Sequence, residues 1–535
     1  MAQIKRILKC RGLWYAAASV VLLYFLYLKT YDDLIVRIPS PEFDNVRRFY
    51  WWMMVAGCGF LLFEGVCLWT GKKKLWLFPL TAVFLGLFYM AVLPPFSAPD
   101  EQRHFVTAYR ISSEMMGQKS VADEAFLSEA TAKEKEIVEN GGTVLVRAGD
   151  ARQEPYSQVG RDSYALMLDE IFSRDPGGKV TVRPEQPVGV TPVVYLPQAL
   201  GITFARILGL GYIPLIFMGR LFNLLAFAGI VTLAVKVMPF RREILMAVSC
   251  LPMTLHLAAS LSYDTMLIAL TMLFLAWCMY LAYEKSSVEI KDVVILALIL
   301  VLLEPCKIVY LPLTGLCLLI PKKKFQSEKH YWVSLLTVVA VMAAAVFMMN
   351  FVVVAAWAKD TQNYLSWSQT PGFTLADVLH DPYHIFQVYW ETLVVKADYY
   401  QATMLGAYLG NLDPELSIPY FCIFLLWGVL FVCSLRQAGE RVMFTGGQKV
   451  WTVVLIVLSC CLVLFSMLLG WTPKDFTYIT GIQGRYFIPI LPAALFLLYG
   501  NNLTLGKDYT RGALFLECLI SIYGLIRILS LRCFV

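Results

Sequence analysis

A short stretch, PPFSAPDEQRHF at residues 94–105, joins an apolar segment to a set of ionisable side chains. Asp100 and Glu101 follow the apolar run directly, and Arg103 and His104 come next. A carboxylate can take the proton of an attacking hydroxyl group, so Asp100 or Glu101 could act as a general base. Asp100 and His104 are four residues apart, a spacing at which side chains meet on a helix. This pair could also bind a divalent metal ion.

The same stretch has a simpler explanation as the start of a helix. Ser97 could cap a helix that begins near Ala98, with Asp100 three positions further on. Acidic residues are favourable at a helix N-terminus whatever else they do. Phe105 and Tyr109 would then share one face, which predicts an amphipathic helix along the outer membrane surface. The sequence leaves both explanations open.

Four more ionisable residues lie inside or beside apolar segments, where charges are costly and often functional. They are Arg220 in FMGRLFN, Asp264 in SLSYDTM, Lys307 in EPCKIVY and Arg485 in GIQGRYF. Each one alone could be a side chain that extends to the membrane interface, or part of a structural ion pair. The orientation derived below brings all four to the same side of the membrane as the acid pair, which favours a shared site.

The elements that must position these residues are membrane helices. Of the 535 residues, 58% are hydrophobic and 16% are charged, whereas soluble domains have about 45–50% apolar and about 25% charged residues. The apolar runs are continuous and roughly 17–25 residues long, which suits helices that cross about 30 Å of hydrocarbon and excludes a β-barrel. The sequence therefore predicts an all-α polytopic membrane protein with about 13 transmembrane helices. The segments are expected near 13–28, 50–70, 75–93, 212–237, 244–260, 265–283, 291–304, 308–320, 331–356, 416–435, 450–470, 486–500 and 512–530.

Basic residues orient these helices, because positively charged loops remain in the cytoplasm. Lys5, Arg6 and Lys9 precede the first segment, and no small-residue cleavage site follows it. We therefore expect a retained helix and a cytoplasmic N-terminus. Lys72–Lys74 return the chain to the cytoplasm, so residues 94–190 should emerge outside.

This orientation divides the chain into five regions. They are three N-terminal transmembrane helices (1–93), a large extracytoplasmic loop (94–190), a transmembrane core (191–356), a second, aromatic-rich extracytoplasmic loop (357–415) and C-terminal transmembrane helices (416–535). Residues 97–190 contain 16 acidic and 11 basic residues, the composition of a soluble domain. A charged helix over 123–140 and short strands at 143–146 and 179–182 predict a small mixed α/β domain there.

Several classes of site are not supported by the sequence. The 13 cysteines lie mostly in apolar segments and form no CxxC pair, so neither a zinc site nor a disulfide framework is expected. The net charge of +6 is explained by cytoplasmic residues that face anionic lipid rather than by a nucleic-acid surface. No phosphate-binding glycine loop of a soluble nucleotide-binding domain is present.

Five motifs occur in an order that resembles a bacterial family of polytopic membrane proteins, the domain of unknown function number 2142. They are PPFSAPDEQRHF, YLPQALG, GRLFNLL, LPMTLHLAASLSYD and GIQGRYFIPILP, and the resemblance covers roughly residues 80–500. The family is similar in layout to the GT-C superfamily of glycosyltransferases, which use polyprenyl-phosphate sugars at the outer face of the membrane. The resemblance thus implies a GT-C-like glycosyltransferase of the bacterial plasma membrane that serves the cell wall or a surface polysaccharide.

The likeness to GT-C enzymes also implies roles for the residues named above. Those enzymes carry an acid just after a transmembrane helix, in the first large external loop, and Asp100 and Glu101 match this position. Here the acids follow the third expected helix, whereas many GT-C enzymes carry them after the first. Asp100, or else Glu101, would be the base. The other roles would fall to Arg485, Lys307 and Arg220 at the donor phosphate, and to Asp264, His104 and Tyr195 at the sugar or behind the acids.

Two other classes of protein are compatible with the sequence. A transporter or flippase of lipid-linked saccharides would also place charges among many helices, although such proteins commonly show two related halves. A structural membrane protein would explain the external loop but not the converging charges. The expected partners are membrane lipids, a polyprenyl-phosphate-linked sugar donor and a glycan or lipid acceptor, with no nucleic acid. The only cofactor considered is the divalent metal ion near Asp100 and His104.

Overall fold

The computed structural model describes residues 11–37, 40–70, 75–152, 159–359, 363–441 and 444–533, and most of them are helical. The basic residues Lys5, Arg6, Lys9 and Lys72–Lys74, on which the expected orientation partly rests, lie outside the described residues. The orientation of the N-terminus therefore stays a prediction.

Seven helices in the described part of the chain are long and apolar enough to cross a membrane. They are α2 (Arg11–Arg37), α3 (Asp44–Thr70), α10 (Tyr212–Val237), α13 (Asp264–Met279, continued by a π-helical turn at Tyr280–Glu284), α15 (Glu328–Lys359), α19 (Gly446–Trp471) and α21 (Thr510–Arg532). Three more apolar helices are shorter: α4 (Leu77–Val92), the 3-10 helix η6 (Ile308–Leu319) and α18 (Tyr420–Ser434). A helical, multi-pass membrane protein is thus confirmed, and the count of 13 spans stays a prediction.

Three of the expected membrane segments are not single α-helices, and two of these are interrupted. The segment at 244–260 divides into α11 (Glu243–Cys250) and α12 (Pro252–Ala258), because Leu251 takes the extended conformation that a following proline favours. The segment at 308–320 is the 3-10 helix η6, and the one at 486–500 is divided between η8 (Gly484–Phe487) and α20 (Leu491–Phe496). Irregular backbone at membrane depth is tolerated only where protein or a water-filled cavity surrounds it. The breaks therefore mark places where the chain is held by other helices.

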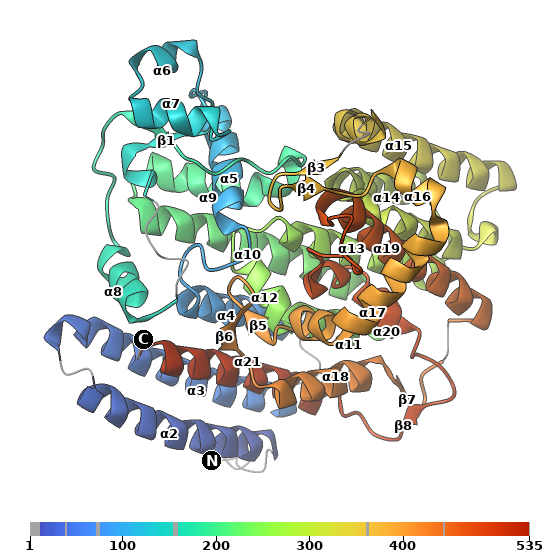
Figure 1. Cartoon of the computed structure of the whole chain (residues 1–535). Coiled ribbons are helices and arrows are strands. Elements are labelled where there is room, and N and C mark those ends of the chain that lie inside the picture. Colours follow the sequence, from blue (N-terminus) through green and yellow to red (C-terminus); the bar gives the residue numbers. More distant parts are fainter. Residues whose placement is uncertain are drawn as a thin grey trace.

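The first and last helices pack together although they are far apart in the sequence. Figure 1 shows α2, α3 and α21 side by side along one edge of the molecule. α4 packs against both α21 and α10, and α10 packs in turn against α13 and α9 (Leu196–Ile207). α4 thus lies between the terminal helices and the helices that carry the charged motifs.

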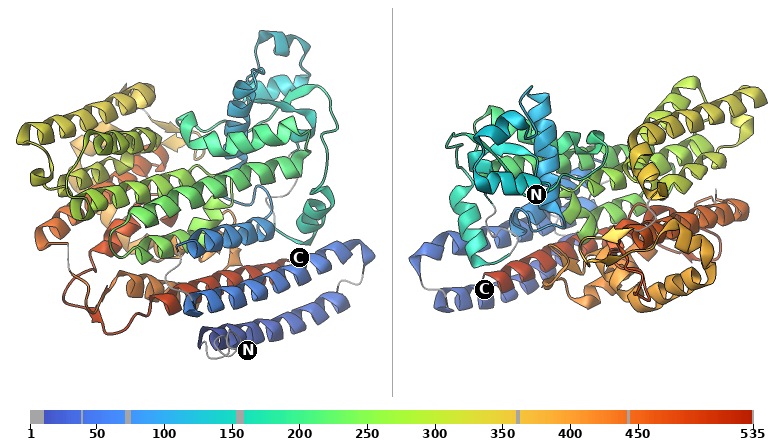
Figure 2. Two further views of the ribbon diagram at one scale, coloured as in Figure 1. Left: turned by 180° about the vertical axis from the view of Figure 1, so that it is seen from behind. Right: turned by 45° about the horizontal axis from the view of Figure 1, so that its top comes forward.

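The described parts of residues 94–190 form a lobe that projects from one end of the helical body, as both views in Figure 2 show. Its elements are α5 (Glu101–Met115), α6 (Glu124–Glu129), α7 (Ala132–Glu139), β1 (Leu145–Arg147), the 3-10 turn η2 (Ala148–Asp150), α8 (Arg161–Glu170) and β2 (Val180–Val182). β1 and β2 pair antiparallel, with Leu145 opposite Val182, which confirms the two short strands. The charged helix expected over 123–140 is two helices, because Thr131 forms a capping box with Glu134 and starts α7 anew.

The helix after the apolar run differs from its prediction in two ways. It begins at Glu101 rather than near Ala98, and Asp100 is its N-cap residue in place of Ser97. It is also mostly buried, because α9 and the 3-10 turn η3 (Pro192–Tyr195) cover it. Phe105 and Tyr109 share one face of the helix, as expected, with ring centroids 5.6 Å apart. α5 therefore lies beneath α9 and η3 instead of on an open membrane surface.

The remaining elements connect and cover these helices. They are η1 (Pro41–Phe43), α14 (Ile290–Leu303), η5 (Glu304–Cys306), η7 (Lys322–Lys324), β3 (Tyr364–Leu365), β4 (Thr370–Pro371), α16 (Leu375–His380), α17 (Pro382–Leu405), β5 (Tyr408–Leu409), β6 (Asp413–Ser417), β7 (Arg436–Gln437) and β8 (Thr504–Leu505). The strands pair in twos, β3 with β4, β5 with β6 and β7 with β8. The aromatic-rich region 357–415 thus contains a long helix, α17, which packs against η8.

The expected orientation can be tested on the lobe. Ser128 is exposed on α6, so a Ser128→Cys variant should react with a membrane-impermeant maleimide in intact cells, above the background of the native cysteines. A Gln326→Cys variant in the loop before α15 should react only after the membrane is opened. The opposite pattern would reverse the orientation of the whole chain.

Candidate functional site

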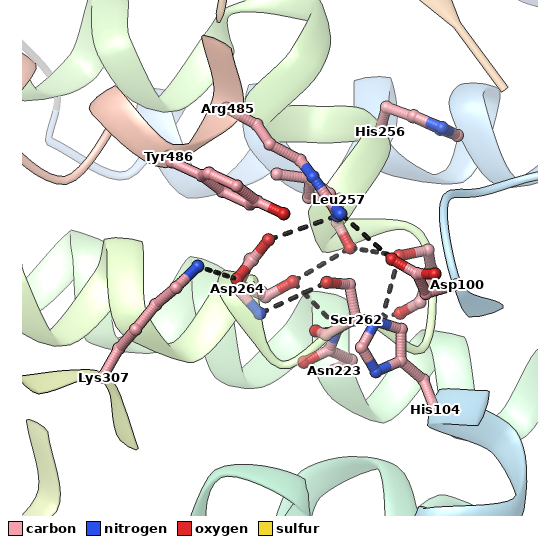
Figure 3. A network of polar contacts seen from close by, with 12 residues as sticks. Asp100, His104, Asn223, His256, Leu257, Ser262, Asp264, Lys307, Arg485 and Tyr486 are labelled. Carbon is pink, nitrogen blue, oxygen red and sulfur yellow. Dashed lines mark hydrogen bonds and ion pairs between the residues drawn. The ribbon is translucent and has the colours of Figure 1, made fainter. Parts of the chain in front are cut away.

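Four of the residues singled out in the sequence form one group of ion pairs, which we call the ion-pair cluster: Asp100, Asp264, Lys307 and Arg485. Figure 3 shows Arg485, from η8, pointing between the two carboxylates. Its Nη1 lies 3.2 Å from Oδ2 of Asp264, and its Nη2 lies 3.3 Å from Oδ2 of Asp100. Nζ of Lys307 lies 3.9 Å from Oδ1 of Asp264. Side chains spread over 385 positions of sequence thus meet at one point.

The approach of η8 to α17 depends on a glycine. A Cβ atom on Gly484 would lie 1.9 Å from the backbone oxygen of Tyr400, which no side chain can occupy. The N–H of Gly484 donates to Oγ1 of Thr403 at 2.8 Å. The residue before Arg485 must therefore be glycine for the guanidinium to reach the acids.

The two neighbouring acids have different surroundings. Asp100 has φ 56°, in the left-handed region that aspartate tolerates better than most residues. Its side chain is 54% exposed, whereas that of Glu101 is fully buried. The turn at residue 100 thus sends one carboxylate toward solvent and the next into the protein.

Glu101 forms a buried, two-contact ion pair with Arg220 of α10. Nε of Arg220 donates to Oε1 at 2.7 Å and Nη2 donates to Oε2 at 2.5 Å. Arg220 also donates to the carbonyls of Leu93 and Pro94, and Glu101 accepts the N–H of Leu261. These bonds occupy both side chains and tie the end of α4 to α10. The geometry gives this pair a structural role, and it leaves Asp100 as the acid open to a reactant.

The guanidinium of Arg485 is buried but has hydrogen-bond donors to spare. Its side chain is 3% exposed, and within the described residues neither Nε nor Nη1 has a hydrogen-bond partner, although Nη1 is attracted to Asp264. A buried donor without a partner costs about 1–3 kcal/mol. A phosphate offers a planar guanidinium paired hydrogen bonds. The free donors of Arg485 therefore suit an anionic ligand with several oxygens.

Lys307 is held beside Arg485 by an aromatic ring that the sequence prediction missed. Nζ of Lys307 lies 3.8 Å from the ring centroid of Tyr486, a cation–π contact. The hydroxyl of Tyr310 donates to the backbone oxygen of Tyr486 at 2.8 Å and supports the turn. Because its contact with Asp264 is long, Lys307 keeps ammonium hydrogens free for a ligand. The feature of the sequence that could have indicated this contact is the aromatic residue directly after Arg485.

Two amide side chains hold the loop that leads to Asp264. Asn223 donates to the carbonyl of Ser260 at 2.8 Å, and Gln198 donates to that of Ser262 at 3.3 Å. Both amides are fully buried. They belong to GRLFNLL and YLPQALG, so each of the five motifs contributes to the cluster or its support. Sequence reasoning missed both amides, although a polar residue inside an apolar motif is itself a signal.

His104 and Tyr195 form a separate contact that supports α5. Nδ1 of His104 lies 2.6 Å from the hydroxyl of Tyr195, and its backbone N–H donates to the carbonyl of Asp100. Burial lowers the pKa of His104 to about 4, so the ring is neutral near pH 7. The side chain of His104 is thus committed to Tyr195. Among the described residues, no three His, Cys, Asp or Glu side chains are placed to hold a metal ion.

Comparison with known proteins gives one match. A family model described as "Predicted membrane protein (DUF2142)" matches residues 83–494. This range contains the ion-pair cluster, the Glu101–Arg220 pair and the two supporting amides. No curated protein and no solved structure matches the chain.

Proposed function

The chain belongs to the DUF2142 family of predicted membrane proteins, and from this membership and the ion-pair cluster we propose that it is a GT-C-type glycosyltransferase. It would transfer a sugar from a polyprenyl-phosphate donor to a glycan, polymer or lipid of the cell envelope. The proposal includes the bacterial plasma membrane, about 13 spans, a cytoplasmic N-terminus and an ion-pair cluster at the outer face. One observation carries it: a buried arginine with unused donors, Arg485, contacts a half-exposed carboxylate, Asp100.

In the proposed reaction, the acid of the cluster activates the acceptor and its cations stabilise the leaving phosphate. Asp100 takes the proton of the acceptor hydroxyl while that oxygen attacks the anomeric carbon. The bond from the anomeric carbon to the phosphate oxygen breaks, and polyprenyl phosphate leaves with the bonding electrons. Arg485 and Lys307 stabilise the negative charge that develops on the phosphate. Asp264, which contacts both cations, holds them in position.

The charges of the cluster balance before a donor binds. Two carboxylates offset two cations, so the site does not rely on an unpaired positive charge to attract a phosphate. The ligand would be recruited by hydrogen-bond donors that the protein leaves free, chiefly Nε of Arg485. This arrangement favours recognition by geometry over long-range attraction.

The test of the function is sugar transfer by the purified, full-length protein in lipid nanodiscs. We expect turnover with at least one polyprenyl-phosphate sugar from a panel of donors, with release of polyprenyl phosphate. The same protein in sealed vesicles should not carry a fluorescent lipid-linked saccharide across the bilayer. Movement across the bilayer without transfer would favour the flippase class.

Arg485→Lys should weaken donor binding more than it slows the chemical step. Lysine keeps the charge but loses the paired hydrogen bonds, and a hydrogen bond to a charged group contributes about 1.5–3 kcal/mol. We expect KM for the donor to rise roughly tenfold to a hundredfold, with a smaller change in kcat. Arg174→Lys, at an exposed arginine of the lobe that donates to the carbonyl of Leu208, is the matched control and should leave both constants unchanged. An unchanged donor KM in Arg485→Lys would remove Arg485 from the phosphate site.

A further inference from the structure

A cavity lies away from the ion-pair cluster, where α3, α4, α11 and α21 meet. It has a volume of about 140 Å³. Its walls are mostly apolar and include Leu68, Phe78, Met246 and Leu514, and at the helix ends it is lined by Arg242, Asp508 and Arg511. No residue of the cluster lines it. The proposed reaction does not use this cavity.

Two acidic side chains from membrane-spanning helices line the cavity. Glu64 of α3 and Glu517 of α21 are 3% and 0% exposed. Glu64 accepts a hydrogen bond from Oγ1 of Thr81 at 3.1 Å. Neither carboxyl oxygen of Glu517 has a hydrogen-bond partner in the described part of the chain. Acidic groups within membrane helices are costly and usually functional.

Among the described residues, no cation lies within ion-pair distance of the Glu517 carboxylate. Four ionisable groups face Glu517: Tyr89 of α4, Cys250 of α11, Cys433 of α18 and Cys518 of α21. The cavity is also lined by Glu64 and Cys67 of α3 and, at the helix ends, by Arg242, Glu243, Asp508 and Arg511. Among the described residues Glu517 has no ion pair, and the arginines lie at the helix ends. A buried carboxylate without a partner takes up a proton rather than keep its charge. Glu517 is therefore suited to bind a proton.

The cavity and the ion-pair cluster lie toward opposite ends of α4. Leu77 and Thr81, at the start of α4, line the cavity, while Leu93, just past its end, accepts a hydrogen bond from Arg220, the partner of Glu101, which is next to Asp100 of the cluster. The 16 residues of α4 span about 24 Å. Ser521, one turn along α21 from Glu517, and Tyr89 of α4 add two buried hydroxyl groups beside the acid. Polar groups thus continue from the cavity into the interior of the helical body.

We propose that Glu517 is a proton-binding site, and that its proton exchanges through this cavity with the solution on the side of the membrane opposite to the ion-pair cluster. The carboxylate gains a proton from water in the cavity to form the neutral acid, and it returns the proton to water when it ionises. Sugar transfer from a lipid phosphate needs no proton from that side. The proton-binding site is therefore independent of the proposed function, and its test needs no assay of sugar transfer.

Dicyclohexylcarbodiimide tests the site, because this apolar reagent adds to protonated carboxyl groups in apolar surroundings and forms a stable acylurea. The full-length protein in sealed vesicles would be treated at several pH values, and adducts located by peptide mass spectrometry. We expect an adduct on Glu517 that is lost as the pH rises on the cavity side. Changing the pH on the side of the lobe alone should not alter it.

The wild-type chain contains its own matched control. Asp292 of α14 is equally buried but forms an ion pair with Lys285, so it should stay ionised and unlabelled. The adduct should be absent from Glu517→Gln. If that variant does not fold, the wild-type protein still tests the proposal, because the adduct on Glu517 should depend on the pH of the cavity side and not on the pH of the lobe side. No adduct on Glu517 at low pH, or an adduct that responds only to the pH on the lobe side, would overturn the site.

Discussion

Asp100→Asn should lower the turnover of sugar transfer by about 10²–10⁴-fold, the usual effect of losing a general base, while the protein remains folded and inserted. Asparagine has the size of aspartate and also tolerates the left-handed conformation of residue 100. It can still begin α5, but it cannot take a proton from the acceptor. The measurement is turnover with a polyprenyl-phosphate sugar in nanodiscs, at saturating donor, together with the thermal unfolding midpoint.

Two companion variants separate chemistry from structure. Asp162→Asn changes an exposed aspartate of the lobe in the same way and should retain wild-type turnover. Glu101→Gln removes the charge next to Asp100, but it disrupts the buried pair with Arg220, so it should lower the unfolding midpoint as well as activity. Wild-type turnover in Asp100→Asn would mean that PDEQRHF is only the start of a helix, as the simpler explanation holds.

Arg220→Met should reduce the free energy of unfolding by about 3–5 kcal/mol, the effect of removing one partner of a buried ion pair. The Glu101 carboxylate would stay buried without a cation, and the carbonyls of Leu93 and Pro94 would lose their donors. The measurement is the thermal unfolding midpoint in detergent, supported by the monodisperse fraction after purification. Large losses of both are expected before any assay of activity.

A double-mutant cycle tests whether the loss of stability comes from the ion pair between Arg220 and Glu101. Lys119→Met removes an exposed ion pair with Asp123 and should change stability by no more than about 0.5 kcal/mol. Combining Arg220→Met with Glu101→Leu removes both charges, so it should cost less than the sum of the two single changes. Wild-type stability of Arg220→Met with a loss of donor binding would instead place Arg220 at the phosphate, as the sequence predicts.

Much of the architecture follows from local properties of the chain. The membrane class depends on the length and continuity of apolar runs, and these are properties of neighbouring residues. The short strands at 145–147 and 180–182 likewise follow from valine-containing runs between turn residues, although their pairing joins segments that are far apart in the sequence. The break before Pro252 is also a local property, because the residue that precedes a proline is disfavoured in the helical conformation.

By itself the sequence determined that the chain is a multi-pass membrane protein and that six charged residues must be explained, because an ionisable group in an apolar context is costly wherever the chain folds. They are Asp100, Glu101, Arg220, Asp264, Lys307 and Arg485. Only the tertiary structure decided which of these charged side chains form ion pairs with one another. Asp100 and Glu101 are neighbours in sequence, yet one meets Arg485 and solvent and the other meets Arg220 in the interior. That difference depends on one left-handed residue and on partners 119 and 385 positions away. Ion pairs act over a few ångströms in space, and the distance between two residues along the chain does not contain that information.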